Sequence, residues 1–133
     1  RVHSEIAQRI VGTCEAQHGI VAVYLFGSLA RGTDRPESDI DVAVLFDHTP
    51  PPHLTGPRFT LEGDLERALG RRVDLVVLND APADLRARVL RDGQLLLDRG
   101  PSARIAFEVR TRNEAFDIAP ILAAYRAPRQ HAS

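Results

Sequence analysis

Residues 24–44, YLFGSLARGTDRPESDIDVAV, connect two strand-like segments through a turn and a loop. The first segment, residues 20–26, is an almost continuous apolar run, which is typical of a strand buried on both faces. It ends at Gly27-Ser28. Glycine and proline then indicate a loop over residues 32–38, and a second strand is predicted over residues 39–46. The sequence therefore predicts a sheet in which a buried strand ends at a glycine-serine turn.

Two aspartates, Asp39 and Asp41, stand at the start of the second predicted strand. Because alternate residues of a strand point to the same face, their carboxylates are expected to project together, about 7 Å apart at the backbone. A third, Asp74, is the lone charge in a strand predicted over residues 73–78, and a neighbouring strand can bring it beside the pair. Clustered carboxylates suit a hard divalent cation. The alternative is a solvent-exposed strand start, with Asp74 on an exposed face.

The Gly27-Ser28 turn has features that suit an anion. Glycine lets the backbone turn tightly and approach a ligand, and the following amides can open a short helical turn whose N–H groups point at that ligand. The Ser28 hydroxyl can donate to a phosphate oxygen, and Arg31 can add a guanidinium. The alternative is a plain glycine turn with a capping serine, and Arg31 can equally pair with an acid. Next to metal-binding acids, a phosphate cradle indicates a nucleotide site.

The rest of the chain alternates amphipathic helices with short apolar segments. A first helix is predicted to be capped by Ser4 and ended by Gly19, and a second to run over residues 61–69 and to be ended by Gly70. A third helix is predicted to start at residues 80–82 and to carry Leu85, Val89 and Leu90. A short strand over residues 95–97 and a closing helix over about residues 102–126, with a kink at Pro120, complete the predicted elements. The proline-rich segment 47–58 cannot be a regular helix or a central strand. This order predicts a single α/β or α+β domain over residues 1–133, with a small mixed sheet flanked by helices.

Composition excludes several classes of protein. The 133 residues can bury a hydrophobic core, and a formal net charge of −1 is not the basic excess of a broad nucleic-acid-binding surface, so no direct nucleic-acid binding is expected. The single cysteine, Cys14, cannot form an intramolecular disulfide; we expect it in the core of a cytoplasmic protein. No apolar run is long enough to cross a membrane, and no signal peptide is visible. The five histidines show no zinc-site spacing.

Gly27-Ser28, ten intervening residues and Asp39-Ile40-Asp41 form the pattern G-S-x10-D-x-D, which resembles the DNA-polymerase-β-like nucleotidyltransferases. With VDLVVL downstream, the segments GSLARG and SDIDVAVL are most similar to the minimal nucleotidyltransferases. That branch includes the MntA-type antitoxins paired with HEPN-domain toxin RNases. The resemblance covers about residues 6–97, and beyond them only the size and a closing helix agree.

The resemblance implies a role for each matching residue. Gly27 and Ser28 would hold the β- and γ-phosphates of ATP, with Arg31 as a further phosphate contact. Asp39 and Asp41 would ligate two Mg²⁺ ions. Asp74 would complete the second metal site and help to deprotonate the attacking hydroxyl. The implied reaction is in-line attack on the α-phosphorus with pyrophosphate leaving.

The acceptor is expected to be bound mainly by something outside the chain, because little sequence remains after the matched core. In the MntA branch, the implied acceptor is a tyrosine near the RNase site of the cognate HEPN toxin, where AMP would add a bulky negative group. The resemblance thus implies an antitoxin that AMPylates and neutralises its toxin. Two alternatives stay open: a non-catalytic antitoxin that masks its toxin by binding, and a nucleotidyltransferase that acts on a small molecule.

Two other features have competing interpretations. The apolar residues of the closing helix either complete the core or form a partner-binding face; they are Phe107, Phe116, Ile121, Leu122 and Tyr125. The arginines at positions 86, 88 and 91 are expected on a solvated helix face, with a toxin or nucleotide contact as the alternative. Tyr24 and Tyr125 could accept AMP themselves, although packing in the core is the expectation for Tyr24.

Overall fold

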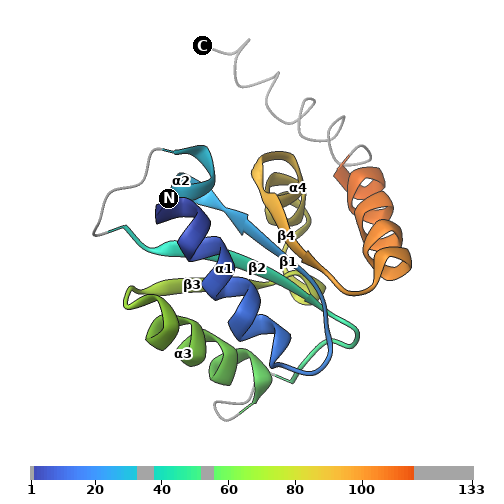
Figure 1. Cartoon of the computed structure of the whole chain (residues 1–133). Coiled ribbons are helices and arrows are strands. Elements are labelled where there is room, and N and C mark those ends of the chain that lie inside the picture. The colour runs from blue at the N-terminus through green and yellow to red at the C-terminus, as the bar shows by residue number, and fades with distance from the viewer. Residues whose placement is uncertain (1, 33–37, 52–55, 116–133) are drawn as a thin grey trace, which may run out of the picture.

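The computed structural model describes residues 2–32, 38–51 and 56–115 (Figure 1). The elements along the chain are α1 (Val2–Glu15), β1 (Ile20–Phe26), α2 (Gly27–Arg31), β2 (Ile40–Phe46), α3 (Pro57–Leu69), β3 (Val73–Val77), the 3₁₀ turn η1 (Leu78–Asp80), α4 (Ala83–Asp92), β4 (Gln94–Asp98) and a last helix, of which residues 101–115 are described. None of the described helices is both long enough and apolar enough to traverse a lipid bilayer.

The four strands form one mixed sheet in the order β3-β2-β1-β4. The central strand β1 is antiparallel to both of its neighbours, whereas β2 and β3 are parallel. A parallel pair needs a crossover connection, and α3 supplies it. The predicted α+β fold, a small mixed sheet flanked by helices, is confirmed.

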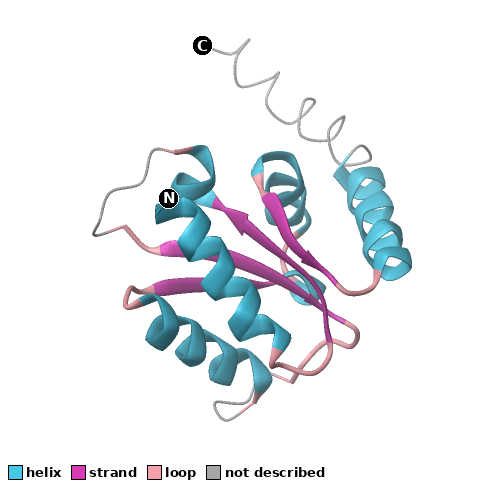
Figure 2. Ribbon diagram, viewed as in Figure 1, coloured by secondary structure: helices cyan, strands magenta, loops and turns pink. Residues whose placement is uncertain are grey.

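Helices cover both faces of the sheet (Figure 2). On one face α1 and α3 enclose the larger core cluster, and on the other α4 and the last helix enclose a second cluster. Every residue of β1 is buried as a result, and β2 is buried throughout except at Asp41. Cys14 lies in the larger cluster and is fully buried, as predicted.

The ends of several elements differ from the predictions. The first helix begins at Val2, so Ser4 lies inside its first turn and does not cap it. Asp39 lies one residue before β2, and Leu78 belongs to the 3₁₀ turn although it is fully buried. Apolar periodicity detects burial, and Leu78 is buried without being in the strand, so this signal placed the end of the strand one residue too late.

The last helix is linked to the sheet by a partly buried cluster of polar side chains. Phe107 packs in the second core cluster, which confirms that this residue completes the core. Beside it, the hydroxyl of Tyr24 donates to Oε2 of Glu108 over 2.7 Å, and Arg104 binds both Glu108 and Asp98. Tyr24 is buried, as expected. The other members of the predicted closing face lie outside the described residues, as does the predicted kink at Pro120; they are Phe116, Ile121, Leu122 and Tyr125.

Candidate active site

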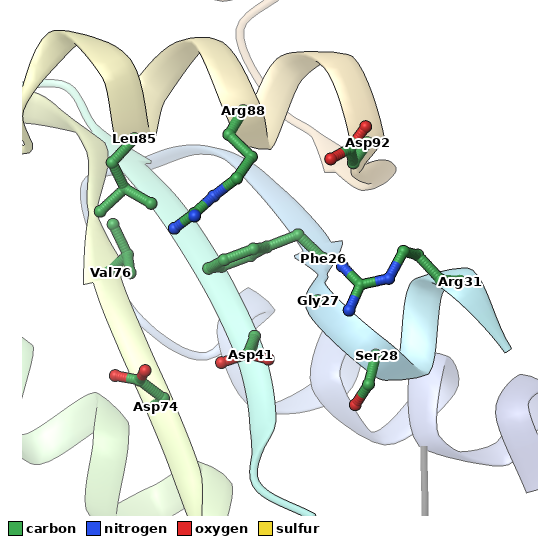
Figure 3. A pocket seen from close by; sticks show the side chains of 10 residues that line it. All are labelled: Phe26, Gly27, Ser28, Arg31, Asp41, Asp74, Val76, Leu85, Arg88 and Asp92. Atoms are coloured by element: carbon green, nitrogen blue, oxygen red, sulfur yellow. The ribbon is translucent and has the colours of Figure 1, made fainter. Parts of the chain in front are cut away.

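A cavity of about 380 Å³ opens between the sheet and α4, on the face that α4 and the last helix cover (Figure 3). Its walls come from five elements: the end of β1, the short helix α2, β2, β3 and α4. Five of the six site residues predicted from the sequence line this one cavity: Gly27, Ser28, Arg31, Asp41 and Asp74. The sixth, Asp39, does not.

Gly27 turns the chain from β1 into α2 with a φ of +77°, in the left-handed region that glycine tolerates. The lack of a side chain matters here for a second reason. A β-carbon added to Gly27 would overlap Oδ2 of Asp41 and lie 2.8 Å from its Cγ. Position 27 is therefore restricted to glycine both by the turn and by the carboxylate that lies against it.

Asp41 and Asp74 are direct partners in the parallel pair of β2 and β3. Neighbouring strands are about 4.8 Å apart, so the two side chains leave the same face of the sheet side by side. On the other side of Asp41, its partner in β1 is Phe26. The floor of the cavity is therefore a row of three residues across three strands: Phe26, Asp41 and Asp74. The prediction that a neighbouring strand brings Asp74 beside Asp41 is confirmed.

The environment of Asp41 disfavours its charge. Its side chain is half-buried, and burial is the largest cause that raises the pKa of this carboxyl above 3.8, followed by the negative charges of Asp74 and Asp39. Two guanidiniums, of Arg31 and Arg88, oppose the shift without cancelling it. The floor of the cavity thus carries negative charge that the chain's own cations leave only partly neutralised.

Asp39 is exposed just before β2 and influences Asp41 electrostatically from there. Within residues 2–32, 38–51 and 56–115, no three acidic, histidine or cysteine side chains stand close enough together to hold a metal ion. The structure therefore brings together two of the three predicted ligands, and the metal role of Asp39 stays a prediction. The paired carboxylates nonetheless fit a hard divalent cation, which takes oxygen ligands and would offset their repulsion.

Helix α4 contributes to the cavity three residues that were not among the predicted site residues. They are Leu85, Arg88 and Asp92, spaced i, i+3 and i+7 on one stripe of the helix. Arg88 is exposed, as expected for a solvated helix face, but it also lines the cavity, so the alternative of a nucleotide contact stays a prediction. The other two arginines are engaged locally: Arg86 donates to the carbonyl of Ala81, and Arg91 pairs with Asp92.

The sequence profile of the family described as polymerase beta nucleotidyltransferase matches residues 8–102, which include all of these cavity residues. The chain belongs to this family. The predictions of a nucleotidyltransferase enzyme and of a nucleotide substrate are thereby confirmed at the level of the family.

Individual relatives indicate which branch of the family this chain resembles. The protein adenylyltransferase MntA of Thermococcus cleftensis is 35% identical over 74 residues, which are 56% of this chain and 72% of the relative. The protein of the same name from Shewanella oneidensis is 41% identical over 75 residues, which are 56% of this chain but 51% of that longer relative. The resemblance of this nucleotidyltransferase to the MntA branch is confirmed.

A solved structure agrees over almost the whole chain. One chain of a toxin–antitoxin complex crystallised with AMP-PNP superimposes with a TM-score of 0.79 at 27% identity, covering 93% of this nucleotidyltransferase and 98% of that chain. The agreement extends past the region that the sequence comparisons match.

Proposed function

We propose that this nucleotidyltransferase is an antitoxin that transfers AMP from ATP to a tyrosine of a cognate HEPN-domain toxin, with Mg²⁺ as cofactor, and so neutralises the toxin's RNase activity. The observation that carries the proposal is the meeting of Gly27-Ser28 with the paired carboxylates Asp41 and Asp74 in one cavity. The names of the relatives, protein adenylyltransferase MntA, support the choice of AMP and of a protein acceptor. We expect the reaction in the cytoplasm, where ATP is available and Cys14 stays reduced.

In the proposed reaction, the oxygen of the acceptor tyrosine attacks the α-phosphorus of ATP, the bond from that phosphorus to the bridging oxygen breaks, and pyrophosphate leaves. Ser28 and the amides at the start of α2 hold the phosphate chain, and Arg31 neutralises part of its charge. Asp74 accepts the proton of the attacking hydroxyl. Asp39, Asp41 and Asp74 would hold two Mg²⁺ ions, which when bound would supply positive charge to stabilise the entering and leaving oxygens.

The experiment is an intact-mass measurement of the protein encoded beside this chain, the proposed HEPN-domain toxin, coexpressed with the wild type or with the double variant Asp39→Asn/Asp41→Asn. The substitutions keep the side-chain volume and remove the negative charge. We expect the partner to gain one or more AMP units with the wild type and none with the variant, and its RNase activity to fall only where the mass rises.

The other outcomes identify the alternatives. A partner that is unmodified, yet bound and silenced by both versions, would replace the proposal with inhibition by masking. Purified chain that binds no such partner, but incorporates labelled AMP into small molecules of a cell extract, would replace the protein acceptor with a small one. Copurification with the partner, measured in the same preparations, separates these two cases.

A further inference from the structure

Arg88 reaches into the cavity from α4, and its guanidinium faces the floor that carries Asp41 and Asp74 (Figure 3). The wall around it is apolar, made by Phe26, Val76 and Leu85. Arg88 is exposed and lines the cavity, so its guanidinium is accessible to an anion that enters from the solvent.

Arg88 differs from the other arginines of α4 in what it binds. Arg86 and Arg91 are engaged by a carbonyl and a carboxylate of the chain. Within the described residues, no hydrogen bond or ion pair joins Arg88 to another side chain or to the backbone. Its five N–H donors are therefore free for a ligand, in the planar arrangement that matches two oxygens of a phosphate.

The charges of the cavity indicate which ligand. Arg31 and Arg88 approach from two elements, α2 and α4, and both act on the same two carboxylates, Asp41 in the floor and Asp92 at the rim. An anion between the two guanidiniums would lie above the sheet, next to the turn at Gly27-Ser28. That is the place of the nucleotide's phosphate chain in the proposed reaction.

We propose that Arg88 is a second phosphate-binding arginine of this active site, which contacts the phosphate chain of the bound nucleotide from the α4 side while Gly27, Ser28 and Arg31 contact it from the α2 side. This inference rests on the proposed function for the identity of the ligand, a nucleoside triphosphate. It assigns to α4 a part in binding the substrate in addition to its part in covering the sheet.

The test measures nucleotide binding without turnover. Calorimetric titrations with α,β-methylene-ATP and α,β-methylene-GTP in Mg²⁺ would compare the wild type with Arg88→Ala and Arg88→Lys. A matched control is Arg67→Ala, which removes an exposed arginine from α3 on the opposite face of the sheet, where it pairs with Asp64. Melting curves of each variant check that it is folded.

We expect Arg88→Ala to raise the Kd about 10- to 100-fold, the range for losing charge-assisted hydrogen bonds. Arg88→Lys keeps the charge without the planar fork, so a smaller loss is expected, and Arg67→Ala should leave the Kd within about twofold. Because the contact is with phosphate, the loss should be the same for both bases. A Kd unchanged in Arg88→Ala, a loss confined to the adenine nucleotide, or a wild type that binds neither nucleotide would overturn the inference.

The two proposals fail in different ways. A wild-type chain that binds the analogues and depends on Arg88 for this, but leaves the HEPN-domain partner unmodified, refutes the proposed acceptor and supports the role of Arg88. Modification of the partner that is normal in Arg88→Ala at limiting ATP refutes the role of Arg88 alone.

Discussion

The carboxylate of Asp41 occupies the space in which any residue other than glycine at position 27 would place its β-carbon. The glycine of the G-S motif and the second aspartate of the D-x-D motif are therefore one packing unit, although fourteen positions separate them. The resemblance to the family assigns them separate roles, one toward phosphate and one toward metal, but each also sets the position of the other.

This contact predicts a severe effect of Gly27→Ala. The added methyl group must push Asp41 away from its place beside Asp74 and must also adopt a φ of +77°, so we expect nucleotidyl transfer to fall by at least about 100-fold and stability to fall by about 1–3 kcal/mol. The control is Gly70→Ala, which has a φ of +65° but no atom within 4 Å of the added β-carbon. It should lose similar stability and keep its activity. Equal loss of activity in both variants would contradict the role of the contact.

The raised pKa of Asp41 predicts that Asp41→Asn stabilises the metal-free protein while abolishing its activity. The folded state binds the proton of Asp41 more tightly than the unfolded chain, so the contribution of Asp41 to stability is fully present below pH 3.8 and is lost as the pH rises through its raised pKa. We expect the variant's advantage to grow from pH 4 to pH 7 and to stay below about 1 kcal/mol, because solvent screens the half-buried carboxylates. In EDTA at pH 7 the melting temperature should rise by up to about 4 °C.

Asp84→Asn is the control for this measurement. Asp84 is an exposed acid in the first turn of α4, where a negative charge favours the helix. Its removal should lower the melting temperature slightly, opposite in sign to Asp41→Asn. A melting temperature that falls for both variants at pH 7 would show that burial and the neighbouring acids do not disfavour the charged form of Asp41.

The hydrogen bond from Tyr24 to Glu108 predicts that Tyr24→Phe loosens the last helix. The ring keeps its packing, and Glu108 keeps its bond to Arg104, so only the 2.7 Å contact is lost. We expect the free energy of unfolding to fall by about 1–2 kcal/mol in urea, and the amide protons of residues 104–111 to exchange faster with solvent. An unchanged urea midpoint would mean that the bond adds nothing beyond the packing of the ring.

Burial predicts that Cys14 is chemically inert in the folded protein. It is fully buried, and burial raises the pKa of its thiol to about 12, so about one molecule in 10⁴ carries the thiolate at pH 8. Ellman's reagent at pH 8 should therefore label the native protein only on the timescale of unfolding and should label it at once in urea. Stoichiometric labelling of the native state within seconds would contradict this placement.

The parts of the site that the sequence could predict are those within one strand or one turn. The period of two in β2 and the apolar run of β1 are local signals, and G-S-x10-D-x-D links them at a constant spacing. The lone charge of Asp74 in an apolar strand was informative although its side chain is exposed, because Asp41 lies beside it in the parallel pair and both carboxylates line one cavity.

The sequence left the placement of Arg88 open between a solvated helix face and a toxin or nucleotide contact, because that placement depends on how α4 lies against the sheet. Arg86, Arg91 and Asp92 lie close to it in sequence, and such a concentration of charges predicts a solvated helix face. The stripe of Leu85, Arg88 and Asp92 was visible at the spacing i, i+3 and i+7, but only the packing of α4 shows that this stripe lines the cavity. The exposed position of Asp39 likewise follows from where β2 begins, which a pattern of alternate residues does not determine.

The order of the strands also has a consequence for how the chain folds. The central strand β1 comes early in the sequence, but one of its edges has no partner until β4 is made. The register of this pair places Ala22 of β1 opposite Asp98 of β4. The three strands that carry the carboxylates and the glycine turn can associate first, through contacts that are closer in sequence. During synthesis, the most apolar strand of the protein is therefore left with an unpaired edge, a template for aggregation that only the last strand removes.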